Sequence, residues 1–178
     1  DGIFVIAAAG NSDPQQNISD VSSPASLTGV IAVGAHDRGG DPWADSAVGA
    51  QMDPETGEER TFPNQKPEIL APGVDLWSCR GSDRDPPYAF STGTSDSTVM
   101  VTGALALILS LHGEHIAGEN GIIELHEMHL VKVALANSAQ SDPSQLEAHH
   151  PKKGYGLLDA GEWSRQVEIE FGITQENT

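Results

Sequence analysis

The apolar positions of the chain are grouped into short continuous runs that polar turns separate. Residues 3–9, IFVIAAA, and residues 29–35, GVIAVGA, are two such runs, and each has the length of a strand buried on both faces. Residues 66–74 and 75–79 predict two further short extended segments, separated by Pro72-Gly73. The first part of the chain is therefore expected to form a sheet.

Two helical patterns follow. From Ser95 to about Leu111 the residues are apolar almost all round, which predicts a helix in the middle of the fold. Residues 122–139 form an amphipathic pattern, which predicts a second helix. The expected apolar face of this second helix consists of Leu125, Met128, Val131 and Leu135. Strands that alternate with helices in this way indicate an α/β fold.

The remaining segments are more polar. Residues 49–63 predict a hairpin insertion whose tip is the PETG turn at 54–57. Residues 154–163, GYGLLDAGEW, are expected to return to the core, and residues 164–178 to form a short tail. At 178 residues, the chain has the length of one domain and can bury a core of its own.

The charge of the chain is strongly unbalanced. It holds 26 aspartates and glutamates against 9 lysines and arginines, for a formal net charge of −17. Nucleic acid and anionic membranes are therefore excluded as partners on charge grounds. Two explanations of the acidity remain, an acidic patch for a basic partner and an adaptation of the whole surface to high salt. The carboxylates are scattered along the whole sequence, which favours the second.

Cysteine usage and the chain ends add little. Cys79 is the only cysteine, so no disulfide can form within the chain. We find no signal peptide, and no apolar run is expected to reach membrane-spanning length. Because the chain starts at Asp1 rather than at methionine, we expect that it has been processed or cut from a longer polypeptide.

The stretch FSTGTS, residues 90–95, brings a serine to a tight turn directly before the first helix. The first amide groups of a helix have no partner within it, and they would point at the Ser95 hydroxyl. This arrangement suits an acyl-transfer nucleophile, whose tetrahedral intermediate needs hydrogen-bond donors. The alternative is that Thr94 or Ser95 only caps the helix. The hydrolase elbow G-x-S-x-G does not apply, because position 97 is serine.

Five segments, in this order and spacing, resemble the C-terminal half of the subtilisin-like serine proteases (the subtilase or S8 peptidase family). They are VIAAAGN (5–11), SSPASLTGVIAVGA (22–35), KPEILAPGV (66–74), FSTGTS (90–95) and GYGLLDA (154–160). The resemblance implies a doubly wound, mainly parallel sheet with helices on both faces. Residues 1–163 would then be the C-terminal part of a catalytic domain, and 164–178 a tail.

The resemblance assigns roles to individual residues. Ser95 matches the nucleophile, and its backbone N–H would supply one oxyanion donor. Asn11 matches the side-chain amide that donates to the oxyanion, although an asparagine here can also serve simply to end a strand. Ala8, Ala9 and Gly10 match the small-residue wall of the pocket for the substrate side chain before the scissile bond, a role compatible with tight strand packing.

Two other triad members are not found where the family has them. In this family the aspartate and the histidine precede the serine, and neither D-T-G nor H-G-T-H-V-A-G occurs in that position. The motif HGEHIAG, residues 112–118, is similar to the histidine motif but follows the serine, so we interpret it as a coincidence, with a permuted site as the alternative. The missing N-terminal part of the domain is therefore an expected partner. Asp96, next to the nucleophile, departs from the family pattern.

Metal sites are expected to be few. His126 and His129 lack the H-E-x-x-H spacing and indicate a solvated helix face, and residues 53–59 lack a full calcium-ligand series. No cofactor is expected to be required. A structural calcium or sodium ion is compatible with the resemblance, because the loop around Ala25, Leu27 and Val30 is similar to a place where relatives bind cations through carbonyl oxygens.

The resemblance implies a serine-type endopeptidase that acts on polypeptides, outside the cell or at its envelope, in surroundings that the acidity suggests are salty. This fragment alone is expected to be inactive. The alternative is a catalytically inactive member of the family that serves as a structural or peptide-binding module.

Overall fold

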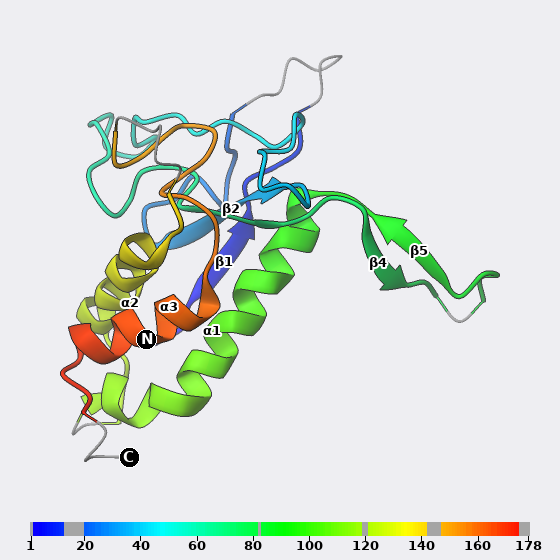
Figure 1. Ribbon diagram of the computed structural model, residues 1–178. Coiled ribbons are helices and arrows are strands. Elements are labelled where there is room, and N and C mark those ends of the chain that lie inside the picture. Colours follow the sequence, from blue (N-terminus) through cyan, green and yellow to red (C-terminus); the bar gives the residue numbers. More distant parts are fainter. Residues whose placement is uncertain (1, 13–19, 82, 119–120, 142–146, 175–178) are drawn as a thin grey trace.

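The computed structural model describes residues 2–12, 20–81, 83–118, 121–141 and 147–174. In chain order the elements are β1 (Val5–Ala8), β2 (Val30–His36), β3 (Ile69–Pro72), β4 (Leu76–Cys79), β5 (Tyr88–Ser91), α1 (Thr94–Ile116), α2 (Leu125–Ser138) and α3 (Ala160–Glu170). In the described residues all the strands precede all the helices (Figure 1), so the predicted alternation of strands with helices is wrong, although both kinds of element are present.

Strands β1, β2 and β3 form a parallel sheet in that order. Val5 pairs with Val30, and Val33 pairs with Ile69. The central strand β2 is buried along its length except at His36, as its continuous apolar run predicts. The expectation that 3–9 is also buried on both faces is wrong, because Val5 is 44% exposed and the rest of β1 is only half-buried; among the described residues β1 pairs with β2 alone.

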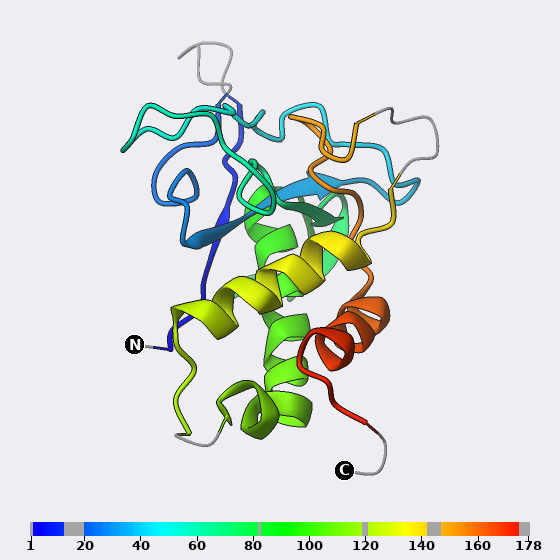
Figure 2. The same ribbon diagram turned by 90° about the vertical axis from the view of Figure 1, so that its left-hand side faces the viewer.

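The two faces of this sheet are covered differently. On one face, Ile31, Val33 and Ile69 pack against apolar side chains of all three helices. On the other face, Ala32 packs with Ala9 and with three small residues of the following loops, Val21, Ala25 and Ala47. In the described part of the chain the helices thus cover one face, and loops take the place of the expected second helical layer (Figure 2).

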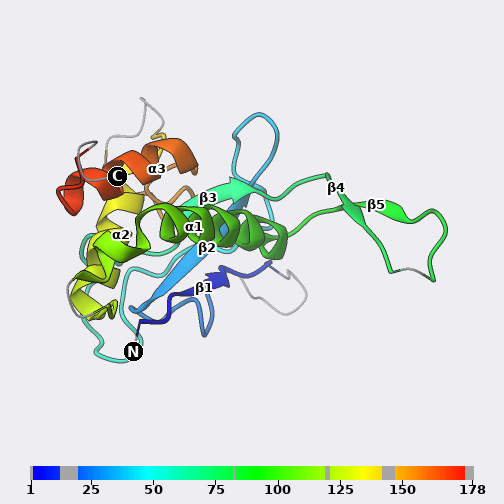
Figure 3. The ribbon, with the colours of Figure 1, turned by 90° about the horizontal axis from the view of Figure 1, so that it is seen from below.

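Helix α1 lies across all three strands, as Figure 3 shows. It is longer than the sequence pattern predicts, and it is not buried all round. One stripe packs into the core, formed by Val101, Ala104, Leu105, Ile108 and Ile116. Another apolar stripe is exposed, formed by Val99, Met100, Leu107 and Leu111, which are 44–68% exposed. A second layer of protein is needed to remove this stripe from water.

By length and composition α1 is long and apolar enough to cross a membrane, with a mean hydropathy of 1.4 over its best window. The expectation that no apolar run reaches this length is therefore wrong. The finding is weak evidence for a membrane span, since the core helix of an α/β domain has the same composition and α1 packs against the sheet.

Helices α2 and α3 pack against each other and against the core. Val131 and Leu135 of α2 are buried as expected, whereas Leu125 is 77% exposed at its first turn. Helix α3 is absent from the sequence interpretation. It begins after Asp159, whose carboxylate accepts a bond of 2.9 Å from the Glu162 amide, and it runs through the expected start of the tail at residue 164. Residues 164–170 therefore pack with the body of the domain.

Two hairpins leave this body. Residues 49–63 form the predicted insertion, with a bridge between Met52 and Glu59 and a turn that the Asp53 carboxylate stabilises by accepting the Glu55 amide. Strands β4 and β5 form an antiparallel ribbon that extends away from the sheet and leads directly into α1 (Figure 1).

Candidate active site

The carboxyl ends of β1 and β3 and the start of α1 meet at one place. The Gly93 amide donates to the Gly73 carbonyl oxygen at 2.8 Å, and the Ser97 hydroxyl donates to the Ala71 carbonyl oxygen at 2.9 Å. A side-chain carbon on Gly73 would lie only 2.8 Å from the Gly93 oxygen, so glycine is required for this close approach. The turn thereby fixes the first residues of α1 against the sheet.

Asn11 is held by the residue that precedes the candidate nucleophile. Its Oδ1 atom accepts two hydrogen bonds from Thr94, at 3.1 Å from the backbone N and at 2.9 Å from the hydroxyl Oγ1. The Gly10 amide in turn donates to the same hydroxyl at 3.3 Å. Because both bonds hold the oxygen of the amide, its Nδ2 atom remains available, and the orientation of the amide follows from the Thr94 donors.

Ser95 is exposed, at the second position of α1. Among the described residues, neither its hydroxyl nor its backbone N–H has a hydrogen-bond partner. The expected alternative, a helix cap made by Thr94 or Ser95, is not what the structure shows, because the N-cap is Gly93 and no side chain caps α1. Ser95 is therefore free for contacts with a ligand.

Gly93 borders the space between these groups. A side-chain carbon at this position would lie 3.4 Å from Asn11 Nδ2, 3.6 Å from Asp96 Oδ2 and 3.8 Å from the Ser95 N. Since glycine has no such carbon, these three atoms border one unfilled position, the gap at Gly93. Asp96 is itself positioned by a 3.0 Å bond from the Ser91 hydroxyl.

The three small residues of the expected substrate wall lie beside this gap but differ in exposure. Ala8 is half-buried at the end of β1, and Ala9 is fully buried in the loop-side core. Gly10 has a φ of 110°, a conformation that favours glycine. The Ala9 methyl group is used for packing, so only the backbone of this segment and Ala8 remain to line a pocket.

The histidine motif at 112–118 lies at the other end of α1. His112 follows Ser95 by 17 positions on the same helix, which places it about 25 Å away. Its Nε2 atom is 3.0 Å from the Ser164 hydroxyl and 3.7 Å from a carboxylate oxygen of Glu168. The motif therefore joins α1 to α3, and the permuted catalytic site is wrong.

His126 and His129 are exposed on α2. In the ranges that the structure describes, no group of three or more His, Cys, Asp or Glu side chains could hold a metal ion. Asp53, in the acidic hairpin tip, makes an ion pair of 3.5 Å with Arg60. The charged tip of this hairpin is thus part of an internal contact.

Some residues of this region were missed by sequence reasoning. Thr94 anchors Asn11, and Ser97 joins α1 to β3. The small and hydroxyl-bearing side chains at the start of α1 indicate that this end of the helix lies close to other backbone segments. They do not indicate which residue each hydroxyl bonds to. A buried cluster of charges at the amino ends of β2 and β3, formed by Lys66, Glu68 and Lys132, gave no signal at all.

Comparison with known proteins identifies the family. The sequence model of the Subtilase family matches residues 1–157. The chain belongs to the subtilase family. Among curated relatives, subtilisin DY of Bacillus licheniformis is 38% identical over 109 residues, and subtilisin NAT of Bacillus subtilis subsp. natto is 36% identical over 111 residues. These matches cover 61% and 62% of this chain, and 33% and 24% of the two relatives.

Solved subtilase structures match over more of the chain. The prenylagaramide maturation protease PagA has a TM-score of 0.64 and 28% identity, over 93% of this chain and 50% of that one. The self-cleaved protease domain of PatA has a TM-score of 0.62 and 25% identity, over 94% of this chain and 51% of that one. The expected subtilisin-like α/β fold, as part of a domain, is confirmed. The chain spans about half the length of these two structures and a third or less of the two curated relatives.

Proposed function

We propose that this subtilase chain carries the nucleophile and the oxyanion donors of a serine-type endopeptidase. In this proposal Ser95 attacks the carbonyl carbon of a peptide bond, and Asn11 Nδ2 and the Ser95 N–H stabilise the negative oxygen that forms. The histidine and the aspartate that complete the triad lie outside this chain. The proposal rests above all on the gap at Gly93, which the Asn11 Nδ2 and Ser95 N atoms both border and which directly precedes the exposed Ser95 on the chain.

The proposed steps use Ser95 and Asn11 of this chain and a histidine supplied by the rest of the domain. The Ser95 proton passes to the external histidine as Oγ bonds to the carbonyl carbon. The tetrahedral intermediate collapses when the leaving amine takes that proton, which leaves an acyl group on Ser95. Water then repeats the sequence and releases the acid. Asn11 helps because Thr94 holds its amide in place before the charge develops, so little reorganisation is needed.

Exposed parts of β1 and α1 support the proposal that a further part of the domain supplies the histidine. Strand β1 has a free edge, and the neighbouring helix α1 presents an apolar stripe to water. We propose that the N-terminal part of the same catalytic domain covers this stripe, extends the sheet beyond β1 and brings its histidine to Ser95. A peptidase assay of this chain with and without the product of the upstream reading frame tests the proposal, since activity is expected only with both.

Two serines on α1 make a matched pair of variants for this assay. Ser95→Ala is expected to abolish peptide hydrolysis in the completed protein, because the nucleophile is removed. Ser110→Ala is expected to have no effect, since Ser110 is exposed on the same helix, far from the gap. Equal activity of the two variants would refute the proposed role of Ser95.

One observation favours a second function. The Asp96 carboxylate faces the gap in which negative charge would develop, and like charges repel. This supports the alternative of a catalytically inactive structural or peptide-binding module. Asp96→Asn keeps an acceptor for the Ser91 hydroxyl and removes the charge. For an enzyme we expect kcat to rise about tenfold, whereas an inactive module gains nothing.

The substrate is proposed to be a polypeptide, with the backbone of Ala8, Ala9 and Gly10 beside the side chain that precedes the scissile bond. An extracellular or cell-envelope location in high salt is proposed on the relatives and on the net charge of −17. If the melting temperature is unchanged between dilute buffer and molar sodium chloride, the high-salt proposal fails, because salt must screen the self-repulsion of the carboxylates.

A further inference from the structure

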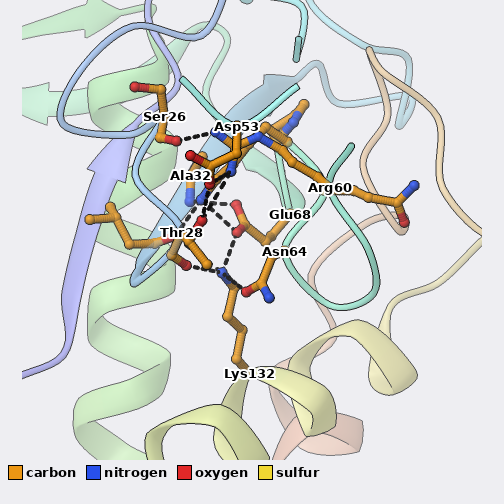
Figure 4. A network of polar contacts seen from close by, with 12 residues as sticks. Ser26, Thr28, Ala32, Asp53, Arg60, Asn64, Glu68 and Lys132 are labelled. Atoms are coloured by element: carbon orange, nitrogen blue, oxygen red, sulfur yellow. Dashed lines mark hydrogen bonds and ion pairs between the residues drawn. The ribbon is translucent and has the colours of Figure 1, made fainter. Parts of the chain in front are cut away.

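Three cationic side chains converge on the loop that leads into β2 (Figure 4). Lys66 Nζ donates to the Val30 carbonyl oxygen at 2.6 Å. Lys132 Nζ, which reaches the loop from α2, donates to the Thr28 oxygen at 2.8 Å and to the Val30 oxygen at 3.3 Å. Arg60 donates through Nη2 to the Ser26 oxygen. Three alternate carbonyl groups, those of Ser26, Thr28 and Val30, therefore each accept a hydrogen bond from a cationic side chain.

A single carboxylate holds the two ammonium groups together. Glu68 Oε1 lies 2.7 Å from Lys66 Nζ and 2.6 Å from Lys132 Nζ, and Glu68 Oε2 accepts the Ala32 amide at 2.8 Å. Lys66 and Glu68 are each 1% exposed, and Lys132 is 6% exposed. These charges are removed from water, so their mutual contacts decide whether they are tolerated.

The same loop includes the carbonyl groups that the family resemblance suggests for a structural cation, those of Ala25, Leu27 and Val30. Val30 O already accepts bonds from both ammonium groups, and Leu27 O accepts the Val30 amide at 3.1 Å. A calcium ion needs six to eight oxygen ligands, several of them carboxylate oxygens. Glu68 and Asp53 are the carboxylates of this cluster in the described residues, and both oxygens of each are engaged. The residues present do not fit a metal ion.

We infer that Lys66, Lys132 and Arg60 replace a structural metal ion in this loop, so that the protein carries its stabilising cations as side chains and does not bind calcium or sodium there. Three of the nine lysines and arginines of the chain are buried in this cluster, although the chain as a whole has a charge of −17. These three side chains therefore serve to bond the carbonyl groups of the loop and do not contribute to the solubility of the surface.

Burial opposes the positive charge of Lys66. Burial lowers the pKa of Lys66 to about 8, and the nearby charges of Lys132 and Arg60 add to that effect against the opposing attraction of Glu68. The fold therefore disfavours the charged form of Lys66 relative to water. An additional divalent ion would be repelled at short distance in a poorly screened site.

Lys66→Glu tests the inference by making the reverse exchange. It places a second carboxylate beside Glu68 and frees one bond to Val30 O, which creates a set of oxygen ligands suited to Ca²⁺. With Ca²⁺ at about 100 times its Kd, we expect the melting temperature of the variant to rise by about 5 °C or more relative to EGTA at equal ionic strength. The wild-type protein is expected to show no such rise.

Arg38→Glu is the matched control, because it makes the same change of charge at an exposed arginine outside the cluster. It reports calcium binding to the acidic surface in general. A calcium-induced rise that is equal in Lys66→Glu and Arg38→Glu would overturn the inference. So would a rise in the wild-type protein that Glu68→Gln removes, since the loop would then be a metal site after all.

Lys132→Met gives a second measurement should Lys66→Glu fail to fold. Removal of this ammonium group leaves the oxygens of Thr28 and Asn64 without the bonds of 2.8 and 2.9 Å that they now accept. We expect a lower melting temperature that Ca²⁺ partly restores, while the same salt leaves the wild type unchanged. If Ca²⁺ restores nothing in this variant, the loop has no capacity for a cation and the inference is refuted.

Discussion

Polar groups at the two ends of the parallel sheet differ in whether they have hydrogen-bond partners. At the amino ends of β2 and β3, the ammonium groups of Lys66 and Lys132 and the carboxylate of Glu68 are buried and bonded to one another or to the backbone. At the carboxyl ends, the Ser95 hydroxyl and the Asn11 Nδ2 atom have no partner among the described residues. One end of the sheet is closed and the other is open.

This difference separates structural polar groups from reactive ones. A buried group without a partner lowers stability, so a cluster that serves the fold has most of its polar atoms bonded. Here the ammonium groups and the Glu68 carboxylate are bonded, whereas the buried Nε atom of Arg60 has no partner among the described residues. Donors that are held in position but left unpaired are available to a ligand, and in α/β sheets such groups collect at the carboxyl ends of the strands. The comparison predicts that changes at the closed end act on stability and changes at the open end act on activity.

Glu68→Ala should produce the largest loss of stability. It leaves two buried ammonium groups without their carboxylate and the Ala32 amide without its acceptor. We expect the free energy of unfolding in urea to fall by about 3–5 kcal/mol. Glu114→Ala, at an exposed position of α1, is the control and should change it by less than about 0.5 kcal/mol. Similar losses in the free energy of unfolding for the two variants would contradict the claim that Glu68 holds the buried charges together.

Asn11→Ala should act on catalysis instead. In the completed protein we expect kcat to fall by about 10²–10³, a magnitude known for an oxyanion donor of subtilisin rather than one worked out from these contacts. KM should change little, because the donor acts mainly on the transition state. An equal fall of kcat in Ser12→Ala, next along the chain, would show that the effect is not specific to the amide.

The pH dependence of stability sharpens the comparison further. Because the pKa of Lys66 is lowered to about 8 in the folded protein, the unfolded chain binds more protons at this group between pH 8 and its ordinary pKa of 10.5. Stability from this group is therefore gained as the pH rises through that window and lost as the pH falls through 8. Relative to Lys66→Met, the wild type should gain about 1.5 kcal/mol between pH 8 and 9.5. A constant difference in urea unfolding across this window would contradict the prediction.

Local patterns were sufficient to predict β1 to β4, α1 and the place of the serine before it, whereas β5 (Tyr88–Ser91) was missed. The apolar run at 29–35 specifies a buried strand because every residue can face a packed layer. Burial of β1 and α1 was predicted incorrectly, since it depends on what covers a free edge and an apolar stripe. A sequence pattern carries no information on whether that cover belongs to the same chain.

Other features could not be predicted because they depend on contacts between distant segments. The buried residues of α3 are Trp163 and Val167, and most of the residues around them are polar or charged. Two apolar positions give too weak a hydrophobic periodicity to identify a helix from the sequence. The cluster joins Lys66 and Glu68 to Lys132 on α2, and charged residues are ordinarily expected at the surface. The anchoring of Asn11 by Thr94 likewise becomes visible only when β1 and α1 are placed side by side.

The most direct test of the central claim is the rate at which a fluorophosphonate labels Ser95, with the site identified by peptide mass spectrometry. The account predicts negligible labelling of the chain alone, where the hydroxyl has no base, and rapid labelling once the N-terminal part of the domain is added. Rapid labelling of Ser95 in the chain alone, or none in the completed protein, would contradict it.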